Sequence, residues 1–265
     1  MYSSFQIATK FLRYYCTAAN GRGHGMHSPF VFDFIQMVLR DNKKYPCYNK
    51  IELVRKKVLS DHRTITVEDF GAGSAIIKTR QRKISAIAAS SLKSKKYAQL
   101  LFRIVQYYQP NNIVELGTSF GISTAYLCAG NEKANVFSCE GSAAIAKMAA
   151  ENFSTLKLPT INIIEGDFTN TLPSLLKEIK KIDFAFIDGN HRKLPTLDYF
   201  QQLLACRSEE SIFIFDDIHW STEMEAAWEI IKQDPAVTAS IDLFFIGIVF
   251  FRSEFKVPRH FSIRF

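Results

Sequence analysis

The feature that most constrains the fold of this sequence is a regular alternation of strand-like and helix-like segments after residue 110. Short runs rich in β-branched and aromatic residues, which are typical of buried strands, occur at 112–116, 135–139, 161–165, 182–187 and 211–215. Helical patterns separate or follow them, at 122–130, 142–156, 170–180, 195–206 and 221–233. Strands joined through helices lie parallel, so we predict an α/β fold with a parallel sheet covered by helices on both faces.

The two ends of the chain depart from this alternation. Segments 238–244 and 247–252 are strand-like, but they lie too close in sequence for a helical crossover, so we predict that they pair as an antiparallel hairpin. Upstream of residue 110 the pattern is helical and interrupted; Ser28-Pro29, for example, is typical of a helix start. We therefore predict a mainly helical N-terminal extension over 1–109 and an α/β domain over 110–265.

Composition narrows the class of protein. Hydrophobic residues make up 47% of the chain and charged residues 22%, as in an ordinary globular protein. No apolar run approaches the roughly 20 residues that a membrane-spanning helix needs. None of the five cysteines forms a CxxC pair, which favours a reducing compartment over a disulfide framework or a zinc site. We predict a cytoplasmic protein without a membrane segment.

The charges are distributed unevenly along the chain. Residues 1–110 contain 19 Lys+Arg against 6 Asp+Glu, whereas the remainder contains 14 against 20. A basic N-terminal segment is suited to binding nucleic acid or another anionic ligand, and it is equally typical of solvated helices. The charge pattern leaves both interpretations open.

Two glycine-containing segments resemble loops that cradle a nucleotide, EDFGAGS at 68–74 and VELGTSFGIS at 114–123. In a parallel sheet, ligands bind at the carboxyl ends of the strands. A nucleotide loop therefore requires a strand before it, a helix after it, and an acid at the end of the next strand to bind the ribose hydroxyls. Only the second segment meets all three conditions, because segment 135–139 ends at Glu140. We interpret 68–74 as a structural or lid segment.

Acidic residues also follow the later strands. Asp167 is placed to accept a hydrogen bond from an adenine amine, and it is equally suited to cap the next helix. Asp188 follows the fourth strand, and Asp216 and Asp217 follow the fifth. These last three carboxylates are predicted to converge at one edge of the sheet, where a divalent cation such as Mg²⁺ would offset their repulsion. The alternative is that they cap loops and turns.

Two further residues are candidates for proton transfer. His191 lies three residues after Asp188, and a histidine beside a metal-bound hydroxyl is suited to act as a general base. Asp198 lies early in the next predicted helix and is a second candidate, although a solvated helix face explains it equally well. With Asp188 they form the predicted catalytic group.

Residues 110–252 resemble a class I S-adenosylmethionine-dependent methyltransferase, and are most similar to the metal-dependent catechol and caffeoyl-CoA O-methyltransferase-like group. ELGTSFGIS resembles the first motif of that group, Glu140 its ribose-binding acid, Gly166-Asp167 its adenine-side motif, and IDGNH (187–191) its motif after the fourth strand. The resemblance implies a Rossmann-like, doubly wound, mostly parallel seven-stranded sheet that ends in the antiparallel hairpin. It also implies S-adenosylmethionine as cofactor, a small-molecule hydroxyl as acceptor, and an N-terminal extension that caps the site or forms a homodimer.

The same resemblance assigns residues to the two sites. It implies metal ligands at Asp188, Asp216 and Asp217. The cofactor-binding residues that it implies are Glu115, Gly117, Thr118, Ser119, Gly121, Ser123, Glu140, Gly141, Ser142, Gly166, Asp167, Phe168 and Asp188. Two departures concern the metal site. Catechol-type enzymes have Asp-Asn where this chain has Asp216-Asp217, and a catalytic lysine where it has His191.

Three other functions are alternatives to this interpretation. A nucleic-acid methyltransferase would use the basic N-terminal segment, but the amine-methylating members of that class carry Asn/Asp-Pro-Pro-aromatic where this chain reads IDGN. An NAD-dependent oxidoreductase normally has the tighter GxGxxG loop. A non-catalytic binding protein that keeps the fold is the third alternative.

Overall fold

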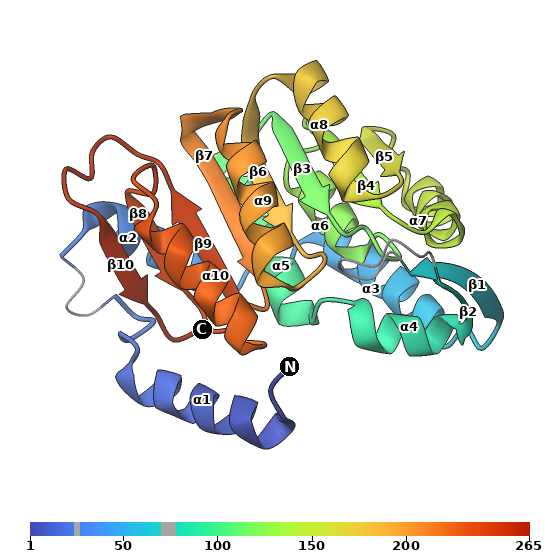
Figure 1. Ribbon diagram of the computed structural model, residues 1–265, viewed down its shortest axis with the longest axis horizontal. Coiled ribbons are helices and arrows are strands. Elements are labelled where there is room, and N and C mark those ends of the chain that lie inside the picture. The colour runs from blue at the N-terminus through green and yellow to red at the C-terminus, as the bar shows by residue number, and fades with distance from the viewer. Residues whose placement is uncertain (24–26, 70–77) are drawn as a thin grey trace. The chain divides into compact units, whose positions relative to one another are not determined.

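The computed structural model describes residues 1–23, 27–69 and 78–265 (Figure 1). The chain forms two compact units, one made of residues 42–179 and the other of residues 1–41 together with 180–265. This division does not follow the boundary at 109/110, which stays a prediction about domain organisation. Of the segment 68–74, residues 70–74 lie outside the described residues.

Within the described ranges, no helix combines the length and the apolar character needed to cross a membrane.

The unit formed by residues 42–179 contains a parallel sheet in the order β3 (Asn112–Leu116), β4 (Asn135–Glu140), β5 (Ile161–Glu165). Each strand is followed by a helix: α6 (Ile122–Gly130), α7 (Ala143–Leu156) and α8 (Phe168–Ile179). These elements confirm the predicted alternation almost residue for residue. The register aligns Leu116 with Cys139 and Cys139 with Ile164, so the three strands end at a common edge.

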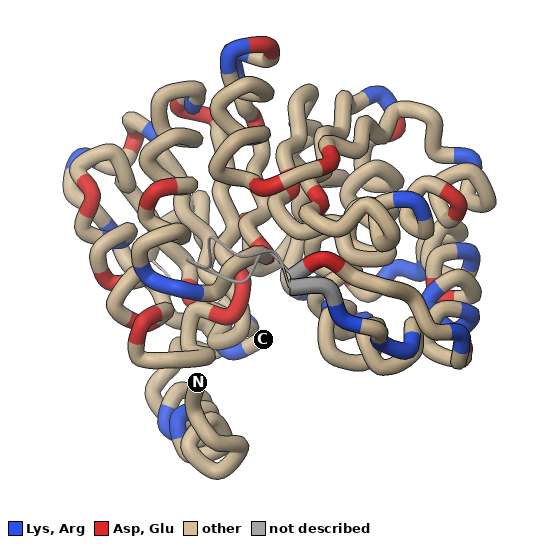
Figure 2. Tube along the Cα trace, turned by 45° about the vertical axis from the view of Figure 1, so that its right-hand side comes forward, with Lys and Arg blue, Asp and Glu red and all other residues tan. Residues whose placement is uncertain are grey.

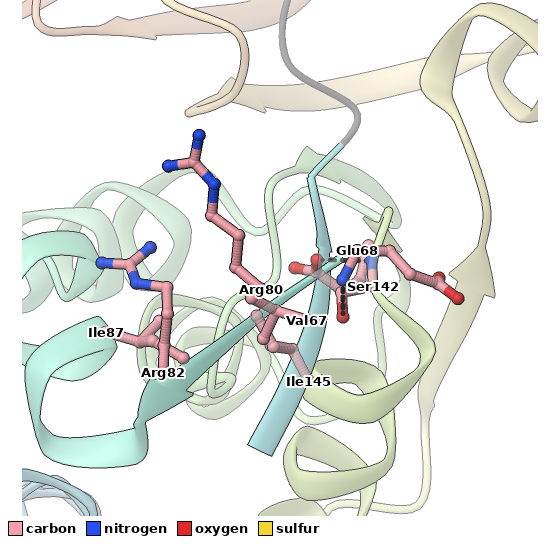
Figure 3. Close-up of a pocket in the computed structure, with 8 residues that line it drawn as sticks. Val67, Glu68, Arg80, Arg82, Ile87, Ser142 and Ile145 are labelled. Atoms are coloured by element: carbon pink, nitrogen blue, oxygen red, sulfur yellow. Dashed lines mark hydrogen bonds between the residues drawn. The ribbon is translucent and has the colours of Figure 1, made fainter. Parts of the chain in front are cut away.

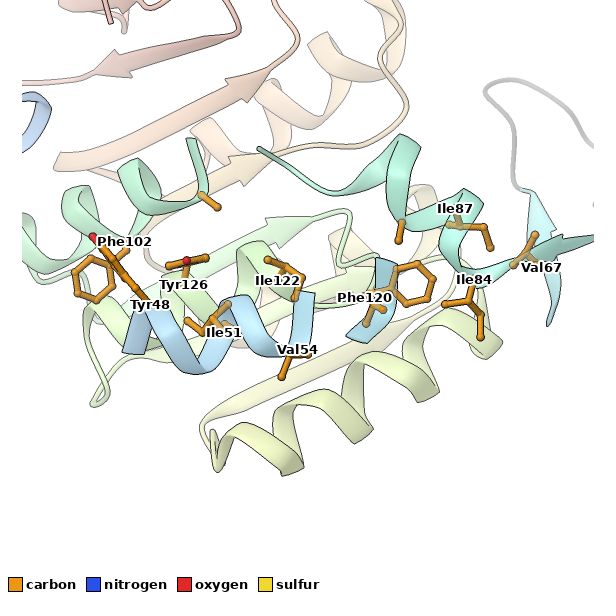
Figure 4. Packing of buried hydrophobic residues seen from close by; sticks show 14 residues of the cluster. Tyr48, Ile51, Val54, Val67, Ile84, Ile87, Phe102, Phe120, Ile122 and Tyr126 are labelled. Carbon is orange, nitrogen blue, oxygen red and sulfur yellow. The ribbon is translucent and has the colours of Figure 1, made fainter. Parts of the chain in front are cut away.

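The N-terminal part of this unit contains α3 (Pro46–Leu59), α4 (Ile84–Ser91) and α5 (Lys95–Tyr108), in agreement with the mainly helical character predicted upstream of residue 110. Their apolar faces pack with α6 in one buried cluster, in which the rings of Tyr48 and Phe102 lie 5.0 Å apart edge to face (Figure 4). Between α3 and α4 lies an antiparallel hairpin of β1 (Thr64–Asp69) and β2 (Lys78–Lys83), which the sequence did not predict. The strand β2 reads KTRQRK and has no apolar residue that would indicate a strand.

The second unit contains the strand order β10-β8-β9-β7-β6. Here β6 (Ile182–Ile187) is parallel to β7 (Arg207–Asp216), and β9 (Ile246–Phe250) is antiparallel to both β7 and β8 (Ala239–Asp242). The predicted C-terminal hairpin is thus confirmed. The strand β10 (Arg259–Ser262), parallel to β8, is additional to the seven strands predicted, because its short polar sequence carries no strand signal. The helices α9 (Lys193–Leu204) and α10 (Thr222–Gln233) belong to the same unit.

The N-terminal segment of this unit packs against its C-terminal strands. At the predicted helix start, the Ser28 hydroxyl accepts a hydrogen bond from Val31 N, and α2 (Pro29–Phe34) continues into the π-helix η1 (Ile35–Leu39). The ring of Phe30 contacts that of Phe250 edge to face, with centroids 4.9 Å apart. In α1 (Ser4–Thr17), the Tyr14 hydroxyl donates to the carbonyl of Ile263.

A charged network also holds α1. His219 lies between two carboxylates, with Nδ1 3.0 Å from Glu225 Oε1 and Nε2 2.9 Å from Asp242 Oδ2. Glu225 in turn accepts hydrogen bonds from Lys10 Nζ and from the Tyr2 hydroxyl. Burial alone would lower the pKa of His219, but the two carboxylates outweigh it and raise the pKa above its ordinary value. A protonated His219 ring donates to both carboxylates, so we interpret the network as one that stabilises the fold.

The packing of α10 on β9 makes Gly247 intolerant of a side chain. A Cβ atom at Gly247 would lie 2.6 Å from the ring of Trp228, which is itself 1% exposed. We expect Gly247→Ala to lower the free energy of unfolding by about 1–3 kcal/mol, the usual cost of overpacking a core. Urea denaturation measures this change. In a Trp228→Phe background the added methyl should cost less, and equal costs in the two backgrounds would show that the indole is not the obstacle.

Candidate functional site

The loop between β3 and α6 has the conformation that a ligand-binding glycine loop requires. Its backbone is tied to the neighbouring strand, because Gly117 N and Thr118 N both donate to the Cys139 carbonyl, at 3.0 and 3.1 Å. Gly121 has φ +78°, and a Cβ there would lie 2.3 Å from the Phe153 ring on α7. Only glycine therefore allows the loop to turn this closely over α7.

Glu140 joins this loop to the loop that follows β4. Its Oε2 accepts a hydrogen bond of 2.8 Å from Ser119 N, and its Oε1 accepts one of 3.0 Å from Ser142 N. The side chain is half-buried at the carboxyl end of β4. Burial raises the pKa of Glu140, although the backbone N–H groups that it accepts from partly oppose this rise. The carboxylate thus lies fixed at the position that the motif analysis assigned to the ribose acid.

Glu115 lies beneath the loop. Its side chain is fully buried and accepts hydrogen bonds from the hydroxyls of Thr124 and Ser138, and the Thr118 hydroxyl lies 2.6 Å from that of Ser138. Burial raises the pKa of Glu115 to about 7, despite hydroxyl donors that include Ser123. Glu115 and Thr118 are fully buried, so they are placed to support the loop from beneath.

The adenine-side motif lies at the end of β5. Gly166 N donates to the Glu140 carbonyl at 2.9 Å, and Gly166 has φ +128°, a conformation that favours glycine. Asp167 Oδ1 accepts from Thr169 N at 2.9 Å, so the expected capping of α8 by Asp167 is observed. Phe168 is the first residue of that helix, and Gly141 and Ser142 follow β4 at the same edge. The cofactor roles of these residues stay predictions.

A cavity of about 160 Å³ lies beside Glu140 (Figure 3). It is bounded by the loop after β4, by α4 and α7, and by the β1–β2 hairpin. Its lining residues are Val67, Glu68, Arg80, Arg82, Ile87, Glu140, Ser142 and Ile145. The contribution of β2 to this cavity could not be predicted from the sequence, because nothing in KTRQRK shows that it pairs with 64–69.

The second unit brings together Asp188, His191 and Asp216. Each offers one ligand atom, and these atoms all lie within 4.8 Å of one another, with His191 Nε2 3.6 Å from Asp188 Oδ1. Asp188 follows β6 and Asp216 ends β7, as the strand-end rule predicted. Asp216 is 1% exposed, whereas Asp188 and His191 are half-buried.

Asp217 and Asp198 are not part of this cluster. Asp217 adopts φ +53°, and its N–H donates to the Phe245 carbonyl at 2.7 Å. Asp198 lies on the exposed side of α9 and accepts a hydrogen bond from Gln202 Nε2 at 2.8 Å. The cluster of potential ligands thus contains His191 and not Asp217. The metal-binding roles assigned to Asp188, Asp216 and Asp217 stay predictions.

The comparisons with known proteins show what this fold and these motifs are similar to. Residues 114–218 match a family model described as a methyltransferase domain. Together with the solved structures below, this match confirms the predicted resemblance to class I S-adenosylmethionine-dependent methyltransferases. Among curated proteins, none has a matching sequence.

Similar solved structures show an O-methyltransferase-like fold. A Bacillus cereus O-methyltransferase in complex with S-adenosylhomocysteine is 19% identical, with a TM-score of 0.55 over 81% of this chain and 95% of that one. An S-adenosylhomocysteine-bound methyltransferase from Podospora anserina is 15% identical, with a TM-score of 0.60 over 85% and 97%. The O-methyltransferase TomG from Streptomyces achromogenes, in complex with S-adenosylmethionine, is 14% identical, with a TM-score of 0.58 over 83% and 95%.

The buried Glu115 predicts a pH dependence of stability. Its pKa is about 7 in the folded protein and near the ordinary 4.5 in the unfolded chain, so unfolding between these pH values releases a proton. Stability is therefore expected to fall as pH rises from 4.5 to 7 and then to level off. The wild type should lose roughly 3 kcal/mol of unfolding free energy over this pH range. Glu115→Gln has no ionisable group at this position, so its stability should not show this loss.

Urea denaturation at several pH values between 4.5 and 8 measures this difference. Glu151→Gln, an exposed replacement on α7, is the matched control and should follow the wild type. Parallel stability curves for the wild type and Glu115→Gln would contradict the prediction.

Proposed function

We propose that this protein is an S-adenosylmethionine-dependent methyltransferase that methylates the hydroxyl group of a small molecule with the assistance of a divalent metal. The observation that carries the proposal is the Glu140 carboxylate, held by Ser119 N and Ser142 N at the junction of two loops and lining a cavity. The match to a methyltransferase domain and the ligands named for the similar structures support the same cofactor.

The residues around Glu140 fit the cofactor. A carboxylate that accepts only backbone N–H groups keeps acceptor capacity for a pair of ribose hydroxyls. The loop at 117–121 allows close approach because Gly117 and Gly121 carry no side chain. When bound, S-adenosylmethionine supplies a methyl group already activated by its sulfonium, so the contribution required of the protein is mainly to orient the two reactants.

The donor set of Asp188, His191 and Asp216 fits a divalent cation. Metal–ligand bonds of about 2.0–2.2 Å place neighbouring ligand atoms roughly 3–3.5 Å apart. The 3.6 Å between His191 Nε2 and Asp188 Oδ1 is close to this range, and the remaining pairs, which lie within 4.8 Å, would draw together around an ion. Two carboxylate oxygens are typical for Mg²⁺ or Mn²⁺, and the imidazole nitrogen adds affinity for ions such as Mn²⁺, Co²⁺ or Zn²⁺. When bound, such an ion would orient the acceptor hydroxyl and lower its pKa.

His191 has two possible roles in this proposal. As a ligand, it would hold the cation through Nε2 and Asp217 would remain outside the site. As a general base, it would take the acceptor proton, with Asp217 completing the ligand set, as the resemblance implies. The cluster of Asp188, His191 and Asp216 favours the first role.

Replacement of Glu140 tests the cofactor site. Glu140→Ala removes the charged acceptor proposed for the ribose hydroxyls, and we expect S-adenosylmethionine to bind at least about tenfold more weakly. Isothermal titration gives the dissociation constants. Glu140→Gln keeps one acceptor oxygen and should lose less. The exposed Glu165, which is aligned with Glu140 in the sheet register, provides the control Glu165→Ala.

An unchanged dissociation constant in Glu140→Ala would show that the ribose binds elsewhere. If the wild-type protein does not bind S-adenosylmethionine at millimolar concentration, the proposed activity itself is wrong.

Metal binding is tested on chelator-stripped protein. We expect Mn²⁺ or Co²⁺ to raise the melting temperature, and bound Co²⁺ to give a visible absorption spectrum. Asp188→Asn and Asp216→Asn should each weaken the binding strongly, because each removes a charged ligand. His191→Ala should weaken Co²⁺ binding about 10–100-fold if the imidazole is a ligand, an effect comparable to the loss of an ordering partner at known metal sites.

Asp217→Asn is the discriminating variant. Little change in Co²⁺ affinity supports the cluster with His191, whereas a loss larger than that of His191→Ala assigns Asp217 as the third ligand. Absence of any binding by the wild type would remove metal assistance from the proposal.

A further inference from the structure

The register of the β1–β2 hairpin places two arginines on the face that it turns toward its own unit. Residues directly opposite in an antiparallel pair share one face of the sheet, and here Val67 faces Arg80 and Ile65 faces Arg82. Val67 is 6% exposed and belongs to the buried cluster that includes Ile87, so this face is the inner one. Gln81 and Lys83 alternate with the arginines and therefore lie on the outer face.

Both inner-face arginines, Arg80 and Arg82, line the cavity beside Glu140. Among the described basic side chains of β2, which are blue in Figure 2, Arg80 and Arg82 line the cavity, whereas Lys83 does not. Figure 3 shows both guanidinium groups extending from the same face of β2. Neither forms an ion pair with another residue in the part of the chain that the structure describes.

The charges of the lining indicate what kind of ligand it suits. Two guanidinium groups, of Arg80 and Arg82, and the carboxylate of Glu140 line the cavity. Glu68 also lines it, but this residue alternates with Val67 along β1, so its side chain belongs to the outer face. A compact anion would be repelled by the Glu140 carboxylate. A neutral ligand that carries hydroxyl groups and ring nitrogens is matched, because carboxylates accept from hydroxyls and guanidinium groups donate to ring nitrogens and stack on aromatic faces.

The remaining walls of the cavity support the same interpretation. Val67, Ile87 and Ile145 contribute apolar surface, which suits the flat face of a base. The volume of about 160 Å³ is below the roughly 300–1,000 Å³ of sites that enclose a whole drug-sized ligand, so the cavity suits one part of a larger molecule.

Hydrogen bonds tie the hairpin to Glu140. Glu68 N donates to the Ser142 hydroxyl at 3.4 Å, and Ser142 N donates to Glu140 Oε1 at 3.0 Å (Figure 3). Ser142 is 2% exposed, so this link is shielded from water. The arginines are therefore held at a defined place relative to the carboxylate that we assign to the ribose.

We propose that Arg80 and Arg82 form the hairpin wall of the site for the nucleoside half of the cofactor, opposite Glu140. This inference rests on the proposed function, in which Glu140 binds the ribose. The two guanidinium groups donate to the nucleoside and cover it, and they do not bind its amino-acid half.

The test uses two ligands that differ only beyond the nucleoside. S-adenosylhomocysteine carries the amino-acid carboxylate, whereas 5′-methylthioadenosine lacks it. Isothermal titration of Arg80→Ala and Arg82→Ala should show binding of both ligands weakened by the same factor, about tenfold for each arginine. Lys83→Ala and Gln81→Ala, on the outer face of the same strand, are matched controls and should bind like the wild type. Arg80→Lys keeps the charge without the planar fork and should fall between the two.

Three results would overturn the inference. Weaker binding of S-adenosylhomocysteine alone would assign the arginines to the carboxylate of the cofactor. Unchanged binding of both ligands would place the arginines outside the cofactor site while leaving the proposed function intact. Failure of the wild type to bind either ligand would remove the proposed function together with this inference. Melting temperatures within a few degrees of the wild type establish that the variants are folded. If Arg80→Ala does not fold, Arg80→Lys provides the measurement.

Discussion

The candidate cofactor site of this protein depends on one arrangement, a carboxylate held by the backbone N–H groups of two loops that belong to different strands. Ser119 and Ser142 are 23 residues apart in sequence, and each donates to one oxygen of Glu140. Neither loop has a regular structure of its own that would hold it in place. The two loops are held together by this shared acceptor and by the hydrogen bonds from Gly117 and Thr118 to the Cys139 carbonyl. The pairing of β3 with β4 therefore sets their relative position.

A second acid, Glu115, lies below this arrangement, where burial raises its pKa. Glu115 is the penultimate residue of β3, just before the loop, and it is buried where an ionised group would be strongly disfavoured. Its hydroxyl partners reach it from α6 and from β4, so it joins the elements on either side of the loop. Both hydroxyls donate to the same oxygen, Oε2, so Glu115 joins α6 and β4 through a single acceptor atom.

The sequence predicted the parts of the fold that follow from periodicity and the parts of the site that follow from strand ends. The strands from 112 to 216, the C-terminal hairpin, and the convergence of Asp188 and Asp216 belong to this group. The β1–β2 hairpin and β10 could not be predicted, because KTRQRK and RHFS carry no strand pattern and acquire one only from their partners. The position of His191 beside Asp188 and Asp216, with Asp217 outside that cluster, could not be predicted for another reason. It accompanies positive φ angles at Asn190, His191 and Asp217, which such residue types adopt more often than other non-glycine residues but at positions that the sequence does not specify.

The division of the chain has a consequence for the order in which it folds. One unit is continuous from residue 42 to 179, whereas the other is assembled from residues 1–41 and 180–265. During synthesis from the N-terminus, α1 emerges long before Glu225 and Ile263, to which its Lys10 and Tyr14 bind. The continuous unit is complete while the first 41 residues still lack their partners. Contacts that span more than 200 residues close slowly, so docking of α1 is expected to be among the last steps of folding and to report that the C-terminal strands are in place.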